Sequence, residues 1–198
     1  MAAPHPLILY TSCVQLCTIC RVDKFIQRYY RLGMTDIQNL DLLPEEVLKE
    51  ILLLEEQQKR LETRSEAQDK FMSYVKHVYE GFIEGTHHRI ISEKLERIAS
   101  GDLKRLIVNM PPRHSKSEFA SYLMPSWFLG RNPKLKIIQA TMNTELAVRF
   151  GRKVRDLIAD PVYREIFPNT DLKPDSQAAG RWETSAGGEY FAAGVGAA

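Results

Sequence analysis

Between Leu106 and Ile158 the chain alternates short apolar runs with helical patterns, and this alternation restricts the fold more than any other sequence feature. Residues 106–108 and 135–140 are apolar runs typical of buried strands, whereas residues 115–129 and 143–158 have helical spacing. Strand, helix, strand and helix in this order predict an α/β domain with a parallel sheet. Two further strands, near 181–184 and 190–195, are expected to form a hairpin through Gly187 and Gly188.

The preceding part of the chain has the pattern of helices. The spacing predicts one helix from Pro44 to about residue 64, a second over 65–79 and a third around 90–98 that ends at Gly101. Early glutamates and late basic residues in the first of these would complement its dipole. Residues 1–33 show no sustained period and are interpreted as a doubtful extension before a fresh start at Met34. The expected domains are thus a helical segment over 34–100 and a core over 101–198.

Composition places the chain among ordinary globular proteins. Of its 198 residues, 44% are apolar and 26% charged, and the 27 basic side chains nearly balance the 25 acidic ones. Residues 101–198 carry 14 basic and 10 acidic side chains, so any contact with a polyanion is expected there. No apolar run has the roughly 18 residues that span a bilayer, and the start lacks a basic region, so the protein is predicted neither to be secreted nor to cross a membrane.

Three cysteines, Cys13, Cys17 and Cys20, lie close together near the start. Their odd number argues against a closed set of disulfides and favours a reducing compartment. Their spacing is compatible with an iron–sulfur cluster or with three incidental thiols, and the short chain favours the thiols.

The junction between the first predicted strand and the following helix, residues 110–117, has the sequence MPPRHSKS. Phosphate-binding loops lie at such junctions, where free backbone amides and the helix N-terminus surround the phosphates. Lys116 and Ser117 match the lysine and the magnesium-binding hydroxyl of the Walker A pattern G-x4-G-K-[ST], but Met110 and Ser115 occupy its two glycine positions. Arg113 could clamp a γ-phosphate. The alternative interpretation is an ordinary basic loop.

Four blocks of the sequence together resemble a known family. They are LKRLIVNMPPRHSKSEFASYLMPSWFLG, KIIQATMNTELAVRFGRKVRDLI, YREIFP and AAGRWETSAGGEYFAAGVG, within roughly residues 34–196. This set resembles the ATPase half of the large terminase subunits of tailed bacteriophages. The resemblance implies an incomplete P-loop NTPase-like parallel sheet core, preceded by a helical segment, that binds ATP and Mg²⁺.

The same resemblance implies a biological setting. In this family an ATP-driven motor threads viral double-stranded DNA through the portal protein into a procapsid, and a separate endonuclease domain cuts the DNA. The expected partners are therefore viral DNA, the portal protein, the small terminase subunit and further copies in a ring when full length. The expected location is the host cytoplasm, transiently at the procapsid portal.

Site residues follow from the resemblance as well. Arg113 and Lys116 are expected to be catalytic, and Ser117 to bind the metal. The expected nucleotide-binding residues are Arg113, His114, Ser115, Lys116, Ser117 and, from the adenine-side region over 79–88, His88. Alternatively, the residues over 79–88 pack a helix junction with the histidines in solvent, and His114 is only a loop residue.

Some of the family's machinery has no counterpart here. The strand that ends in the Walker B acidic pair would come shortly beyond Gly196, and the nuclease carboxylates later still. The chain is therefore interpreted as an N-terminal fragment that binds ATP, with hydrolysis and DNA cleavage requiring the missing part. Alternatives are a non-enzymatic docking fragment whose helices over 44–79 bind the small terminase subunit or portal, and a helicase-like nucleic-acid translocase.

Two further groups of residues have competing interpretations. The cations Arg149, Arg152, Lys153 and Arg155 could touch DNA phosphates or a neighbouring subunit's nucleotide, or form a solvated helix face. Trp127, Phe128 and Trp182 are expected to be packing residues.

Overall fold

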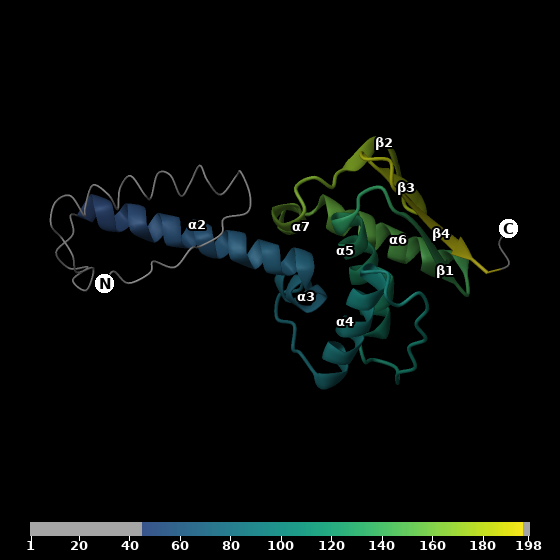
Figure 1. Cartoon of the computed structure of the whole chain (residues 1–198). Coiled ribbons are helices and arrows are strands. Elements are labelled where there is room, and N and C mark those ends of the chain that lie inside the picture. The colour runs from purple at the N-terminus through teal and green to yellow at the C-terminus, as the bar shows by residue number, and fades with distance from the viewer. Residues whose placement is uncertain (1–44, 196–198) are drawn as a thin grey trace, which may run out of the picture. The chain divides into compact units, whose positions relative to one another are not determined.

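The computed structural model describes residues 45–195 (Figure 1). The predictions for the extension over 1–33, its cysteines and the start at Met34 fall outside these residues. The chain divides at Glu55 and Glu56 into two units, and the described part of the first unit is the beginning of helix α2, Glu45–Asp69. The second unit, from Glu56 onward, contains the other described helices and all the described strands.

The helical segment differs from the prediction at its first boundary. A single helix, α2, extends to Asp69, and α3, Phe71–Val78, follows after one extended residue, Lys70, with φ −110° and ψ 120°. The expected break near residue 64 was therefore wrong. The expected match of late basic residues to the helix dipole was wrong too, because the last turn of α2 contains no basic residue. Helix α4, Thr86–Ala99, confirms the third helix, and Gly101 follows it with φ +85°.

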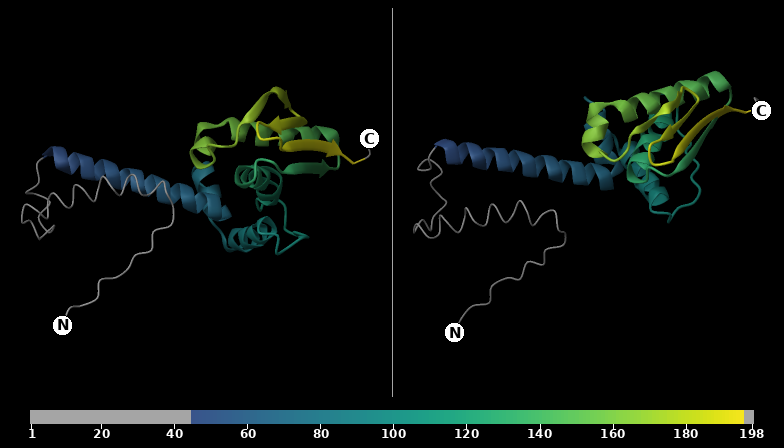
Figure 2. Two further views of the ribbon diagram at one scale, coloured as in Figure 1. Left: turned by 45° about the horizontal axis from the view of Figure 1, so that its top comes forward. Right: turned by 90° about the horizontal axis from the view of Figure 1, so that it is seen from above.

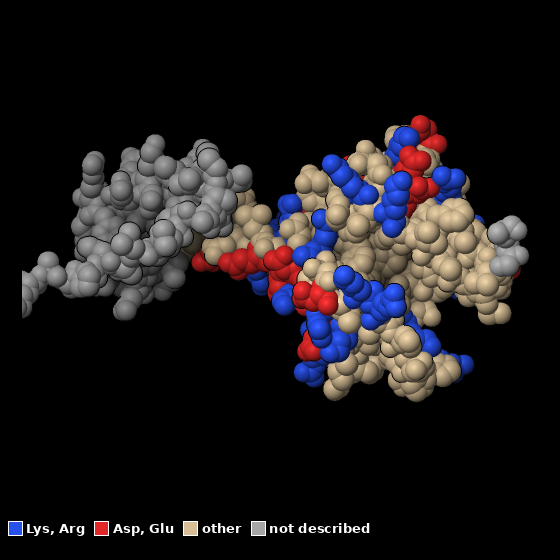
Figure 3. Space-filling view, turned by 45° about the vertical axis from the view of Figure 1, so that its right-hand side comes forward, with Lys and Arg blue, Asp and Glu red and all other residues tan. Residues whose placement is uncertain are grey.

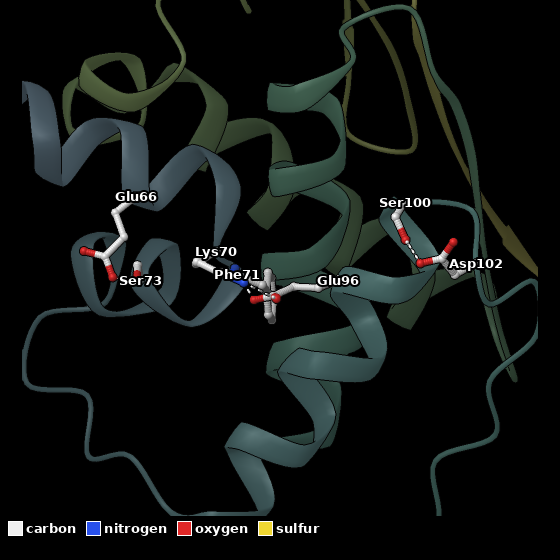
Figure 4. Close-up of polar contacts among 7 residues, drawn as sticks. All are labelled: Glu66, Lys70, Phe71, Ser73, Glu96, Ser100 and Asp102. Carbon is white, nitrogen blue, oxygen red and sulfur yellow. Dashed lines mark hydrogen bonds and ion pairs between the residues drawn. The ribbon is translucent and has the colours of Figure 1, made fainter. Parts of the chain in front are cut away.

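A carboxylate on α4 holds the start of α3 (Figure 4). Glu96 Oε1 accepts the backbone N–H of Phe71 at 2.9 Å, and Glu96 Oε2 lies 3.5 Å from the Lys70 ammonium. The N–H groups of a first helical turn have no partner within the helix, and a carboxylate also complements the positive helix end. Glu96 thus acts as an N-cap supplied by a neighbouring helix.

The expected strand over 106–108 does not form. The backbone from 103 to 111 is neither helix nor strand, and Ile107 is 87% exposed. Leu106, Val108 and Met110 still pack partly against the core, so alternate side chains are half-buried as they would be in a strand. The expected burial on both faces of this run was therefore wrong, and within the described residues no neighbouring strand pairs with it.

The expected helix over 115–129 is divided in two. A helical turn at Lys116 and Ser117 leads into a π-helical segment, η2, Glu118–Leu123, and then into α5, Met124–Arg131. Helix α6, Thr144–Ala159, confirms the next prediction and begins with Asn143 as its cap, whose side chain accepts the Leu146 N–H at 2.8 Å. A short helix that the sequence did not indicate, α7, Pro161–Ile166, follows.

The sheet has four strands in the order β1-β4-β3-β2 and is mixed rather than parallel. The strands are β1 (Lys136–Thr141), β2 (Leu172–Ala178), β3 (Arg181–Thr184) and β4 (Glu189–Gly194). Only β1 and β4 pair in parallel, while β3 forms the expected antiparallel hairpin with β4, turning through Gly187 at φ +90°. The chain is therefore α/β with an open mixed sheet, and the fully parallel sheet was a wrong prediction.

Two groups of aromatic side chains build the core. Between the helices, the Phe71 ring lies edge-on to Trp127 at 5.3 Å and to Phe119 at 5.6 Å. Between α6 and the sheet, Trp182 stacks on Tyr190 at 4.9 Å, and both are fully buried. Helix α6 lies against one face of the sheet, as the two views of Figure 2 show. The packing roles expected for Trp127 and Trp182 are confirmed.

Candidate functional site

The loop between the extended segment and η2 has an unusual backbone. Arg113 and Ser115 have φ values of +64° and +60°, and they are the non-glycine residues with positive φ in the described chain. The left-handed region is costly for side chains other than glycine. Ser115 stands at a glycine position of the phosphate-loop pattern, and its dihedrals are of the kind that glycine favours there. Glycine would therefore be unstrained at this position of the loop.

The backbone amides of this loop are available to a ligand. Within residues 45–195, none of the N–H groups from Arg113 to Ser117 donates a hydrogen bond, and the first bond of the new helix runs from Phe119 N–H to Ser115 O at 2.9 Å. Free consecutive amides, with left-handed residues among them and a helix starting beside them, form an anion-binding concavity. The arrangement therefore suits a phosphate group.

The loop side chains expected to touch the nucleotide are also free in the described part of the chain. Arg113, Lys116 and Ser117 are exposed and make no hydrogen bond or ion pair there. A phosphate-binding lysine must be able to move its ammonium to the β and γ groups, and a hydroxyl must be open to ligate magnesium. The residues present are compatible with a magnesium–nucleotide complex, in which Ser117 would be the protein's metal ligand.

The helix that follows the loop is anchored on both sides. Phe119 is buried, and Glu118 accepts a hydrogen bond from the Lys153 ammonium of α6 at 3.1 Å. The same ammonium lies 4.9 Å from the centre of the Tyr122 ring. The π-helical geometry of η2 widens this first turn, and such turns occur often at functional sites. The sequence contained no signal for the Glu118–Lys153 pair, which joins residues 35 positions apart.

His88 is part of the packing rather than a free recognition group. Its side chain is 7% exposed, its ring stacks on Phe119 at 5.0 Å, and its Nδ1 accepts the Gly85 N–H at 3.0 Å. Burial, and next the neighbouring His87, lower the pKa of His88. The neutral imidazole therefore caps α4, and the alternative that placed this histidine in solvent is wrong. The expectation that His88 reads an adenine edge stays a prediction.

Ring contacts bring the adenine-side segment next to the loop. His87 lies 3.8 Å from His88 and 5.6 Å from His114, measured between ring centres. His114 is exposed, and its Nδ1 lies 2.9 Å from the Pro112 carbonyl oxygen. The structure thus joins the two parts of the expected site through His87, which belongs to the region over 79–88.

The four cations of α6 do not act as one group. Lys153 is paired with Glu118, and Arg155 contacts Asp156 at 2.7 Å, whereas Arg149 and Arg152 are exposed without a partner in the described residues. Figure 3 shows Lys and Arg side chains in separate groups, interspersed with acidic and uncharged residues, on one face of the molecule. Of the four, only Arg149 and Arg152 remain available for contact with a polyanion.

The described chain lacks two other kinds of site. Between residues 45 and 195 no cluster of three or more His, Cys, Asp or Glu side chains is arranged to hold a metal ion. In the same range no helix is both long and apolar enough to span a bilayer. The chain matches no protein family model, no curated protein and no solved structure.

Proposed function

We propose that this chain is the nucleotide-binding part of a large-terminase-type DNA-packaging motor, in which the loop over 111–117 holds the phosphates of ATP. The observation that carries the proposal is the loop itself. Its amides from Arg113 to Ser117 are free, and two non-glycine residues are held in left-handed conformations directly before a helix. The motif order along the sequence supports the terminase assignment over other nucleotide-binding classes.

Each loop residue has a defined part in this function. The amides and the helix N-terminus neutralise phosphate charge, and the Lys116 ammonium adds a point charge that can follow the β and γ groups. Arg113 offers a planar, bidentate group to the terminal phosphate. Magnesium would screen the phosphate oxygens, with the Ser117 hydroxyl as its ligand. We assign the binding of ATP to these residues and assign them no part in ATP hydrolysis or DNA cleavage.

The proposed partners follow from the same assignment. They are viral double-stranded DNA, the portal protein, the small terminase subunit and further copies of the full-length motor in a ring. The proposed location is the cytoplasm of the infected host, at the procapsid portal during packaging. Arg149 and Arg152 are the α6 residues that we propose for contact with DNA phosphates.

Titration of the purified chain with ATP and Mg²⁺ tests the proposal. Lys116→Ala removes a charge-assisted contact that contributes roughly 1.5–3 kcal/mol, so the affinity should fall by about tenfold or more. Lys134→Ala is the matched control, because Lys134 is an exposed lysine outside the loop. If the wild type and both variants bind ATP equally, or none binds it, this function is excluded for the chain.

A further inference from the structure

Residues 104–110 form a segment outside helix and strand, and its side chains alternate between exposed and half-buried from Arg105 to Met110. Within the described chain, none of their N–H or C=O groups takes part in a hydrogen bond. Leu106, Val108 and Met110 nevertheless pack partly against the core, so the segment lies on the body of the protein. Backbone groups in a partly buried position are normally paired, and an extended segment is paired most simply by another strand.

A cavity of about 230 Å³ lies between this segment and α4. Its lining consists of His87, Ile90, Ile91 and Lys94 from the helix and of all five residues from Leu106 to Met110. Successive side chains of an extended segment point to opposite sides. Because consecutive residues from Leu106 to Met110 all line the cavity, the cavity follows the edge of this backbone segment and is not confined to one of its two sides. Its volume is below the range of small-molecule sites, and it suits a single apolar side chain.

The charged residue that lines this groove is a cation, and two further cations directly precede the lining residues of the segment. Lys94 lines the groove, and Lys104 and Arg105 begin the extended segment. None of these three cations forms an ion pair in the described residues. A bound peptide that carries carboxylates would therefore be favoured on electrostatic grounds.

We propose that the groove between α4 and residues 104–110 binds an extended, acidic peptide of a partner protein by β-augmentation. The peptide backbone pairs with the free backbone groups, and one large apolar side chain fills the cavity. Acidic residues beside it face Lys94, Lys104 and Arg105. A second copy of this chain is a poorer occupant, because its own segment over 104–110 carries the cations Lys104 and Arg105 and has no carboxylate to face those of the groove.

The test uses the full chain and a fluorescent ten-residue peptide in which alternating valine and leucine are flanked by glutamates. We expect saturable binding by anisotropy, and at least fivefold slower hydrogen exchange at alternate amides between residues 104 and 110. Lys94→Glu should weaken binding by about fivefold, since it replaces an attraction by a repulsion. Lys59→Glu makes the same change on α2, away from the cavity lining, and should bind within about twofold of the wild type.

Three results would overturn the proposal. The first is unchanged hydrogen exchange at residues 104–110 with the peptide in excess. The second is equally tight binding of a peptide with a central proline, because proline lacks the N–H that a strand ladder needs. The third is hydrogen exchange that becomes slower at residues 104–110 as the protein concentration is raised in the absence of peptide. That result would identify a second copy of the chain as the occupant. Lys116→Ala should bind the peptide like the wild type, so this result is independent of the nucleotide site.

Discussion

Replacing Ser115 by glycine should stabilise the protein, although Gly substitutions usually do the opposite. Ser115 has φ +60°, a conformation that costs a residue with a Cβ roughly 1–2 kcal/mol and glycine almost nothing. Glycine also has more conformational freedom in the unfolded chain, and this entropy offsets roughly 0.5–1 kcal/mol of the gain from relieved strain. The expected net gain in the free energy of unfolding is about 0.5–1 kcal/mol.

Chemical denaturation followed by circular dichroism measures this change. Ala120→Gly is the matched control, because Ala120 is exposed within the helical turn that follows the loop. There glycine should destabilise by about 1 kcal/mol. Ser115→Val should also destabilise, since a β-branched side chain fits the left-handed region worst. If Ser115→Gly lowers stability as much as Ala120→Gly does, the loop does not have the backbone described here.

Three further predictions concern the surroundings of the site. Trp182→Ala removes a fully buried side chain and should lower the free energy of unfolding by about 3–5 kcal/mol in a urea titration. Tyr190→Phe should leave this free energy unchanged or raise it, because the buried Tyr190 hydroxyl has no partner among the described residues. Glu96→Gln keeps the shape of the cap on the Phe71 N–H but removes its charge, so a loss of about 0.5–1 kcal/mol is expected in the same titration. The lowered pKa of His88 means that the unfolded state binds more protons near pH 6, so stability should fall as the pH drops from 7 to 5. His88→Asn, which keeps an acceptor for the cap, should reduce this slope in thermal melts recorded across that range, and an identical slope would show that other groups cause it.

Elements with strong local signals could be predicted from the sequence. Helix α6 has a capping residue and a clear apolar period, and the hairpin of β3 and β4 has adjacent glycines at its turn. Strand β2 has no such signal, because its sequence LKPDSQA is polar and contains a proline. It becomes a strand by pairing with β3, an interaction that local patterns do not encode.

The extended segment over 106–108 illustrates the opposite error. Its apolar residues indicated a buried strand, and alternate side chains are indeed half-buried. A strand, however, is defined by hydrogen bonds to a neighbour, which the composition of the segment cannot supply. The loop after it could be located by its letters, but the left-handed conformations of Arg113 and Ser115 could not be foreseen.

The left-handed turns of the loop are supported by the anchored helix that follows them. On the helix side, Phe119 is buried against Phe71 and His88, and Glu118 is paired with Lys153 of α6. Strained backbone survives only where surrounding contacts outweigh its cost, and a buried Phe contributes about 1.5–3 kcal/mol. The same packing that makes His88 a core residue therefore supports the loop amides that we propose bind a phosphate. In this structure the histidine supports the site through Phe119, whether or not it touches a nucleotide.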